Sequence, residues 1–313
     1  MEKPRIGIVG VGRWGSNIAR VLWELNREDL ISFEIVIDVD IEKAKNIARK
    51  YGVKRYSNNL IDARGLDGVV VAVPIPYLAK TALKLVKQGL NVFVEKPVAR
   101  SVAEIKELIS AVKEKNVKAV AGFIMRFNPV VEYLVKNIKR IDLNVVELRR
   151  LSRRPPSARR NSIILDLAVH DIDIANYLFR DANAMLIKWY HTRIGDDEVI
   201  KIILEYDGIP VMIHVDGICP VKVREIDVIA KEYFIRGNTD TNVIVYKTPY
   251  EERIVKLSGE EPLKKEIKEW IRLLVEGKSM SPTLEDALRV LELAEPILKT
   301  ISFQHAGSYQ KHF

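Results

Sequence analysis

The chain has 313 residues, of which 48% are hydrophobic and 29% are charged. This length and composition predict two folded domains of ordinary size and exclude a disordered protein. The formal net charge of +8 would suit an acidic ligand. Because the basic residues are interleaved with Asp and Glu along the predicted helices, they are typical of solvated helix faces, and nucleic-acid binding is not favoured.

A single cysteine, Cys219, excludes an intramolecular disulfide and any zinc site built from cysteines. The chain starts with Met-Glu-Lys-Pro and runs directly into a predicted strand, without the pattern of a signal peptide. Its longest apolar stretch, Val69–Ala79, contains two prolines and is too short to cross a bilayer. We therefore expect a cytoplasmic protein with no membrane partner.

The first 121 residues predict strands and helices that alternate and are joined by short links. The expected strands are Arg5–Val9, Phe33–Asp38, Gly68–Val73, Val92–Glu95 and Val117–Ala121. The expected helices are residues 13–24, Ile41–Lys50, Tyr77–Gln88 and residues 102–115. This alternation is typical of a doubly wound parallel sheet, so we predict an α/β domain over residues 1–121.

The pattern changes after Gly122, and residues 122–313 predict a second, α+β domain. Its expected helices are Pro129–Ile138, Ile164–Phe179, Pro262–Glu276 and Thr283–Ile301. The last two of these helices could pack back on the first domain. Its expected strands are Asn144–Leu151, Ala184–His191, Val199–Tyr206, Pro210–Asp216 and Val221–Ile235. Asp207-Gly208 and Asp216-Gly217 are predicted hairpin turns. Consecutive strands without helices between them predict a large open antiparallel sheet.

The segment Gly10-Val11-Gly12-Arg13-Trp14-Gly15 follows a predicted strand and opens a predicted helix. Asp38 ends the next strand, at the distance expected of a dinucleotide-binding fingerprint. Gly10 would permit the tight turn, Gly12 the approach of a pyrophosphate to the backbone, and Gly15 close helix–strand packing. Asp38 would bind ribose hydroxyls and repel a 2′-phosphate, so NAD is favoured over NADP. In this context a tight turn without a ligand is the weaker alternative.

The predicted strand Val92–Glu95 ends in Lys96 and Pro97, which places two charges at its carboxyl end. In an open α/β sheet this edge faces the ligand crevice. The proline stops the strand and permits a cis Lys96–Pro97 bond, which would aim the lysine into the cleft. A solvated lysine is the simpler interpretation of this segment alone, but its position after the glycine fingerprint favours an active-site lysine.

Asp166, His170 and Asp173 are spaced to share one face of the predicted helix 164–179. A carboxylate one turn from an imidazole can orient the ring and hold its proton, as a general base requires. A structural histidine, an ordinary acidic helix start and a metal site are alternatives that the spacing leaves open. No second histidine or carboxylate cluster completes a metal site, so we predict none.

An arginine-rich loop, Ser152–Asn161, precedes this helix. Arg153 and Arg159 would bind a phosphorylated or nucleotide-linked substrate through bidentate contacts. A solvated loop or a contact with a neighbouring subunit explains the same residues equally well.

Together these motifs resemble the Gfo/Idh/MocA family of NAD(P)-dependent sugar oxidoreductases, over nearly the whole chain. The resemblance rests on Gly10–Gly15, on Glu95-Lys96-Pro97, on the sequence Gly-Phe-Ile-Met-Arg-Phe-Asn-Pro at 122–129 and on Asp166-x-x-x-His170. It implies a dehydrogenase in which His170 takes the proton of a substrate hydroxyl and Lys96 polarises that oxygen. Asp166 would then orient the histidine or contact the sugar.

The resemblance also implies a first domain that is a Rossmann fold and a set of binding residues. The implied cofactor site consists of Gly10, Gly12, Arg13, Trp14, Gly15, Asp38, Val73, Pro74, Glu95, Lys96 and Pro97. The implied substrate contacts come from Arg126, Asn128 and Asp173, beside the two loop arginines. Ile18 and Leu78 depart from the family, because many members carry histidine at these positions on the cofactor side.

Within the family, Arg126-Phe127-Asn128-Pro129 and the segment 166–173 are most similar to members that oxidise the 3-hydroxyl of UDP-N-acetylglucosamine. Other activities of the same fold are alternatives: a dehydrogenase of a free sugar or inositol, a non-catalytic NAD-binding sensor, or an NAD-dependent glycosidase. The resemblance further implies a homodimer or homotetramer formed through the C-terminal sheet.

Overall fold

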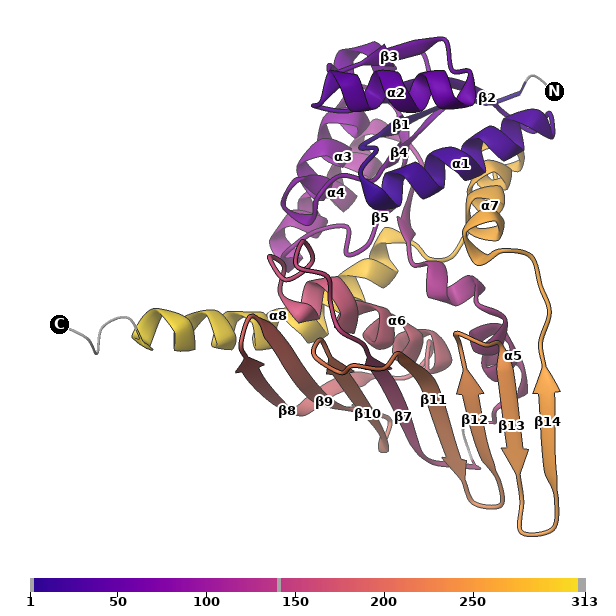
Figure 1. The fold of residues 1–313 in the computed structure, drawn as a ribbon, viewed down its shortest axis with the longest axis vertical. Coiled ribbons are helices and arrows are strands. Elements are labelled where there is room, and N and C mark those ends of the chain that lie inside the picture. Colours follow the sequence, from indigo (N-terminus) through magenta and orange to yellow (C-terminus); the bar gives the residue numbers. More distant parts are fainter. Residues whose placement is uncertain (1–2, 140–141, 309–313) are drawn as a thin grey trace. The chain divides into compact units, whose positions relative to one another are not determined.

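The computed structural model describes residues 3–139 and 142–308. Within these residues the chain forms two compact units, which are described separately (Figure 1). The first unit contains residues 3–124 and 260–288, and the second contains residues 125–139, 142–259 and 289–308. Helix α8 (Leu284–Ser308) carries the chain from the first unit into the second.

A six-stranded parallel sheet forms the centre of the first unit, in the order β3-β2-β1-β4-β5-β6. Its strands are β1 (Arg5–Val9), β2 (Ser32–Ile37), β3 (Arg55–Ser57), β4 (Gly68–Val71), β5 (Asn91–Glu95) and β6 (Ala119–Gly122). Every residue of β4 is buried, as expected of a parallel strand covered on both faces. The predicted doubly wound sheet is confirmed, and the short edge strand β3 is an addition.

The helices of the first unit begin and end close to the predicted residues. They are α1 (Arg13–Arg27), α2 (Ile41–Tyr51), α3 (Leu78–Lys87), α4 (Val102–Lys115) and α7 (Pro262–Glu276), with short 3-10 turns η1 (Leu60–Ala63) and η2 (Ile75–Tyr77). Ser101 caps α4 by accepting a hydrogen bond from the Glu104 N–H at 3.2 Å. Gly89 follows Gln88, the C-cap residue of α3, and has φ +82°, a conformation that glycine adopts without strain and that ends the helix.

Helix α7 belongs to the first unit although it follows the second sheet in the sequence. Its Trp270 is fully buried and packs against Phe93 of β5, with ring centroids 5.8 Å apart. A Cβ on Gly68 would lie 2.8 Å from Trp270 Cζ2, so the glycine that starts β4 leaves the space that the indole fills. Lys118 Nζ also donates to the Leu273 carbonyl at 2.7 Å. The C-terminal segment is therefore part of the core of this unit.

An eight-stranded sheet in the order β14-β13-β12-β11-β7-β10-β9-β8 forms the second unit (Figure 1). Its strands are β7 (Leu143–Leu151), β8 (Ala184–Ile194), β9 (Asp197–Tyr206), β10 (Ile209–Asp216), β11 (Val223–Ala230), β12 (Phe234–Asn238), β13 (Val243–Lys247) and β14 (Glu252–Lys256). The prediction of a large antiparallel sheet is confirmed with one exception. Strands β7 and β10 run parallel in the middle of the sheet.

Two predicted details of this sheet are wrong. Val221–Ile235 is not one strand, because the chain reverses at residues 231–233 and forms the antiparallel pair β11–β12. Asp216-Gly217 is not a hairpin, because β10 pairs with β7 and β9, whereas β11 pairs with the far side of β7. The predicted turn at Asp207-Gly208 does join the antiparallel pair β9–β10, and both of its residues have positive φ.

The helical segments of the second unit include a local departure from the predicted regular helix. They are η3 (Ile124–Phe127, which begins at the boundary), α5 (Pro129–Asn137), a π-helical turn η5 (Ile164–Ala168), α6 (Val169–Leu178) and the end of α8. Helix α5 contacts β12, and α6 contacts β10. Single π-turns in helices occur frequently at functional sites.

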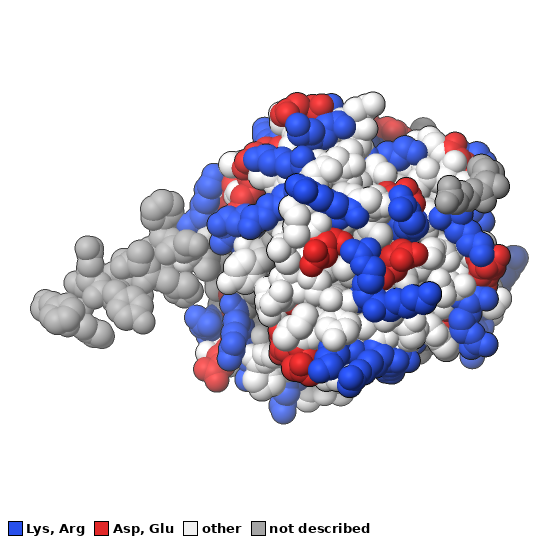
Figure 2. Space-filling view, turned by 90° about the horizontal axis from the view of Figure 1, so that it is seen from above, with Lys and Arg blue, Asp and Glu red and all other residues white. Residues whose placement is uncertain are grey.

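Basic and acidic side chains are intermixed on the face drawn in Figure 2, where lysines and arginines lie beside aspartates and glutamates. This distribution agrees with the predicted solvated helix faces and shows no single basic band on that face. Among residues 3–139 and 142–308, no helix combines the length and the apolar character needed to cross a membrane.

Candidate functional site

The glycine fingerprint lies at the carboxyl end of β1, where the strand order of the first sheet reverses between β1 and β4. Gly10 has φ +89°, and a Cβ there would lie 2.6 Å from the Ala72 carbonyl oxygen. A Cβ on Gly15 would lie 2.0 Å from the Gly10 oxygen. A Cβ on Gly12, in contrast, would have no atom within 4 Å, so of these three glycines only Gly12 faces open space.

The start of α1 offers unused hydrogen-bond donors next to that space. Gly12 is the N-cap and has no capping side chain, and the first turn contains no acidic residue. The free N–H groups and the positive end of the helix dipole fit a pyrophosphate. The neighbouring side chains of Arg13 and Trp14 are exposed.

Asp38 follows β2 and is tied to the fingerprint loop. Its carboxylate accepts a hydrogen bond from the Val11 N–H at 2.8 Å and another from the Asp40 N–H at 2.9 Å. These bonds hold the carboxylate beside the loop, where a ribose would follow the pyrophosphate. Val73 and Pro74 lie after the end of β4. Ile18 of α1 and Leu78 of α3 are buried hydrophobic residues.

Glu95 and Lys96 lie at the same edge, because β5 pairs with β4 through Val94 and Val71. The Lys96–Pro97 peptide bond is cis, as predicted. Glu95 is buried, and its carboxylate accepts a hydrogen bond from the Lys96 N–H at 3.2 Å. Burial raises the pKa of Glu95 to about 7, against the opposing effects of the Trp14 side chain and of Lys96. Lys96 itself is half-buried.

The predicted chemical residues of the second unit lie at the junction of the π-turn and α6. Asp166 is inside the π-turn, and His170 is in the first turn of α6. Both side chains are half-buried, whereas Asp173 is completely buried. The prediction that all three share one helix face stays a prediction. Asp166 and His170 are partly exposed, whereas Asp173 is not.

Arg126 and Asp173 bind each other. The single Nε–H of Arg126 makes a bifurcated hydrogen bond to both Asp173 carboxylate oxygens, at 3.0 and 3.1 Å, and Nη2 donates to Asp173 Oδ1 at 2.6 Å. The guanidinium carbon lies 4.8 Å from the centroid of the Tyr177 ring. Asn128 caps α5 by accepting from the Val130 N–H at 3.0 Å. All three predicted substrate contacts are thus buried in structural interactions, and a direct role in binding substrate stays a prediction.

The arginine loop contributes both of its predicted residues to one open pocket of about 200 Å³. Arg153 is exposed, whereas Arg159 pairs with Asp197 at 3.3 Å and donates to the Arg154 carbonyl at 3.2 Å. Asp196 and Asp197 also line this pocket. Two carboxylates weaken its attraction for phosphate, so Arg153 is the better candidate for a phosphate contact.

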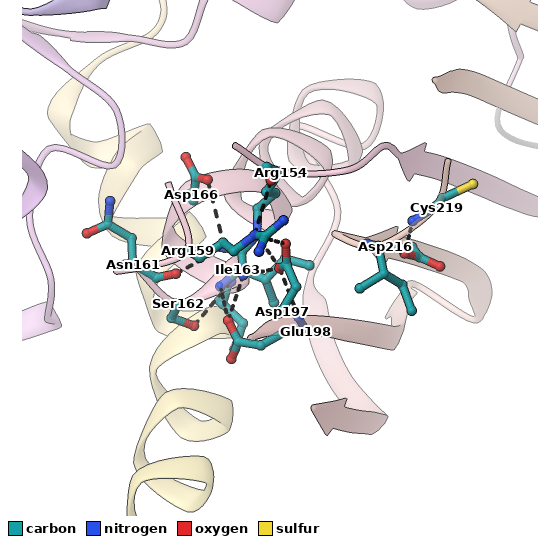
Figure 3. A network of polar contacts seen from close by, with 12 residues as sticks. Arg154, Arg159, Asn161, Ser162, Ile163, Asp166, Asp197, Glu198, Asp216 and Cys219 are labelled. Carbon is teal, nitrogen blue, oxygen red and sulfur yellow. Dashed lines mark hydrogen bonds and ion pairs between the residues drawn. The ribbon is translucent and has the colours of Figure 1, made fainter. Parts of the chain in front are cut away.

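Arg154 is a further residue that the sequence did not single out from its basic neighbours. It is buried and donates to Asp197 at 2.5 Å and to Glu198 at 3.1 Å, as Figure 3 shows. Its remaining nitrogen, Nη1, lies 3.9 Å from the Asp166 carboxylate. Asp197 and Glu198 are more than forty residues away in the sequence, so no local pattern could have found this contact.

The parallel sheet, the glycine loop and Asp38 thus identify the first unit as a Rossmann domain that can bind a dinucleotide. Residues 4–123 match the Gfo/Idh/MocA profile, described as an oxidoreductase family with an NAD-binding Rossmann fold. Residues 4–123 therefore carry the NAD-binding Rossmann domain of this family, and the predicted NAD cofactor is confirmed.

Known relatives agree with this assignment over different lengths. An uncharacterized oxidoreductase from Streptococcus pneumoniae is 35% identical over 125 residues, which cover 39% of this chain and 33% of the relative. An inositol 2-dehydrogenase from Acidothermus cellulolyticus is 28% identical over 90% of this chain and 88% of the relative. The structure of a UDP-N-acetylglucosamine 3-dehydrogenase from Acidithiobacillus ferrooxidans is similar with a TM-score of 0.84, at 18% identity, over 95% of this chain and 97% of that one. The structural similarity shows a common fold.

Gly12 and Gly15 form a matched pair that separates cofactor binding from folding. Gly12→Ala adds a methyl group in open space, so the free energy of unfolding should change by less than about 1 kcal/mol, while NAD binding weakens at least about tenfold. Gly15→Ala forces a methyl group against backbone and should cost about 3 kcal/mol. Calorimetry of NAD binding and thermal unfolding measure the two effects. Unchanged NAD affinity in Gly12→Ala would remove this glycine from the site.

Glu95→Gln tests the buried carboxyl. Because the folded-state pKa of about 7 lies above the ordinary 4.5, the folded state holds the proton more tightly. The contribution of Glu95 to stability is therefore complete below about pH 4.5 and is lost as pH rises through 7. The melting temperature of wild type should fall relative to Glu95→Gln over this window. Glu107→Gln, at an exposed site of α4, is the control; parallel profiles for wild type and Glu95→Gln would contradict the burial effect.

Proposed function

We propose that this protein is an NAD-dependent dehydrogenase that oxidises a hydroxyl-bearing carbon of a sugar. We propose further that the sugar is part of a nucleotide sugar, such as UDP-N-acetylglucosamine oxidised at its 3-hydroxyl. The main support is one combination: a phosphate cradle whose sheet edge also carries Lys96, and a half-buried Asp166–His170 pair in a π-interrupted helix.

Bound NAD supplies the hydride acceptor for the carbon being oxidised. Lys96 donates a hydrogen bond to the substrate oxygen and stabilises the negative charge that develops there. The imidazole of His170 takes the hydroxyl proton, and Asp166 holds the ring in the orientation that this transfer requires. A cation and a base acting on one oxygen favour the alkoxide more strongly than either group alone.

The same residues argue against a non-catalytic NAD sensor. A sensor needs the glycine loop and Asp38, but it has no chemical use for a lysine, an imidazole and a carboxylate together. An NAD-dependent glycosidase would use the same three groups, and it differs in its product. Cleavage of a glycosidic bond with little net reduction of NAD would identify that activity.

For the substrate, Arg153 supports a nucleotide sugar because its exposed guanidinium lies in an open pocket of the second unit. The fold of a UDP-N-acetylglucosamine 3-dehydrogenase is consistent with this choice. The inositol 2-dehydrogenase relative, at higher identity, supports a polyol without phosphate as the second candidate. The two candidates differ in whether a diphosphate must be bound.

Substrate oxidation can be measured as NAD reduction with UDP-N-acetylglucosamine, UDP-glucose, free hexoses and myo-inositol. We expect the fastest turnover with UDP-N-acetylglucosamine and slower turnover when NADP replaces NAD, because of Asp38. Lys96→Ala and His170→Ala should each lower kcat by about 10²- to 10⁴-fold. Arg153→Ala should raise KM about tenfold for nucleotide sugars and leave free hexoses unaffected.

Bound cofactor is also assayed after denaturation, since tight retention of the reduced form would hide turnover. If both variants oxidise the preferred substrate as fast as wild type, the proposed chemistry is wrong. If myo-inositol is the preferred substrate and Arg153→Ala has no effect, the nucleotide-sugar assignment is wrong while the dehydrogenase assignment stands.

We also propose that the protein forms a homo-oligomer through the eight-stranded sheet. Edge strand β8 exposes Met185, Ile187, Tyr190 and Ile194 at 52–61% of their surface, and Met212 of β10 adds a further exposed apolar side chain. Apolar groups of this size on an edge strand are typical of a protein contact. Tyr190→Glu should lower the mass measured by sedimentation equilibrium, whereas Tyr250→Glu, in the exposed β13–β14 turn, should not. A monomeric wild type would refute the proposal.

A further inference from the structure

We propose that Arg154 is a positioning residue that sets the location of the Asp166 carboxylate for the reaction. The inference rests on the proposed role of Asp166 beside His170. It adds a group that lies outside the catalytic set and acts only through Asp166.

Each nitrogen of the Arg154 guanidinium donates to a different partner (Figure 3). Nε donates to Asp197 at 2.5 Å, Nη2 donates to Glu198 at 3.1 Å, and Nη1 donates to the Asn161 carbonyl at 3.0 Å. Nη1 also lies 3.9 Å from Asp166 Oδ2, a distance at which an ion pair attracts without a direct hydrogen bond. The side chain is thereby held at one end by strand β9 and presents its other end to Asp166.

The carboxylate of Glu198 also holds the backbone that leads into the π-turn. Glu198 Oε2 accepts a hydrogen bond from the Ile163 N–H at 2.9 Å, directly before the turn that contains Asp166. His191 Nε2 lies 3.0 Å from the other oxygen of Glu198. Asp166 is therefore located from two sides, through the Arg154 charge and through the backbone at Ile163.

The space around Arg154 is closed, so the side chain has little freedom to move. Only 3% of its surface is exposed. The Arg154 N–H donates to the Gly217 carbonyl at 2.8 Å, and a Cβ on Gly217 would lie 2.2 Å from Asp197 Oδ1 and 3.0 Å from Arg154 Nε. A glycine at 217 is thus required for this loop to close over the ion pair.

Charge makes the arrangement sensitive to the loss of Arg154. Arg154 and Arg159 face the three carboxylates of Asp166, Asp197 and Glu198. Removing the buried cation leaves three carboxylates around one arginine at the edge, and an uncompensated buried charge is strongly unfavourable. Asp166 would then lose the attraction of the Arg154 charge and would move away from its present position.

Arg154→Gln, Arg154→Lys and the control Arg150→Gln test this inference in full-length protein. Arg150 forms a comparable buried pair with Asp171 of α6, at 2.7 and 2.9 Å, and this pair does not include Asp166. We expect Arg154→Gln to lower kcat at least about tenfold with less than a threefold change in KM. Arg154→Lys should recover part of kcat, because it restores the charge without the planar fork.

Arg150→Gln should lose a similar amount of thermal stability and keep kcat within about threefold. Equal losses of kcat in Arg150→Gln and Arg154→Gln, with no recovery in Arg154→Lys, would mean that Arg154 acts only by stabilising the fold and would overturn the inference. The comparison uses whichever substrate the wild type oxidises, so a wrong nucleotide-sugar assignment does not affect it.

Crystal structures of wild type, Arg154→Gln and Arg150→Gln give a second measurement that needs no turnover. The Asp166 carboxylate should move in Arg154→Gln and stay in place in Arg150→Gln. An unmoved Asp166 in Arg154→Gln overturns the inference, whether or not a substrate is known. Failure to find any substrate would instead contradict the proposed dehydrogenase activity.

Discussion

The second unit depends on the pairing of acidic residues on one buried helical segment with arginines that precede it in the chain. Asp171 and Asp173 are buried in α6, and Asp166 is half-buried in the π-turn. Each faces a different arginine: Arg150 from β7, Arg126 from η3 and Arg154 from the loop after β7. An ionised carboxylate in a protein interior is tolerated only when a partner compensates its charge. The three pairs therefore restrict the helical segment to one rotation and one position along its axis.

Such pairs contribute more to placement than to net stability, since desolvation offsets much of their attraction. Their contribution here is geometric. Arg126 and Arg150 hold α6 itself through Asp173 and Asp171. The third arginine differs, because it is bound mainly by Asp197 and Glu198 of β9 and approaches Asp166 from the sheet. Helix and sheet thus both contribute to the position of Asp166.

The sequence predicted the first unit well because its site is made by the backbone. A side chain at position 10 or 15 would collide with the backbone, since an added Cβ would lie as close as 2.0 Å to a carbonyl oxygen. The glycines that avoid this collision form a local motif that can be recognised in the sequence. Parallel strands buried on both faces likewise appear as short apolar runs, of which β4 is the clearest. What the motif did not reveal is Trp270, which enters this core from helix α7, far from Gly68 in the sequence.

The second unit was harder to predict because its decisive contacts join residues that are distant in sequence. The spacing of Asp166, His170 and Asp173 predicted one common face. It did not reveal the π-turn around Asp166 or the burial of Asp173 against Arg126. Nothing in the run Arg153-Arg154 distinguishes an exposed arginine from a buried one, since both follow the same strand. The distinction arises only when β9 brings Asp197 and Glu198 to the second of them.

The two units consequently constrain their sites in different ways. The backbone of the cofactor loop leaves no room for a side chain at Gly10 or Gly15, so its dinucleotide site is easy to recognise from the sequence. A site placed by charge pairs keeps its geometry as long as each carboxylate retains a cation, whatever exposed residues surround it. Exposed side chains such as Arg153 can therefore change without disturbing Asp166 and His170. Under the proposed function, substrate preference in this unit would therefore depend on residues that the fold does not require.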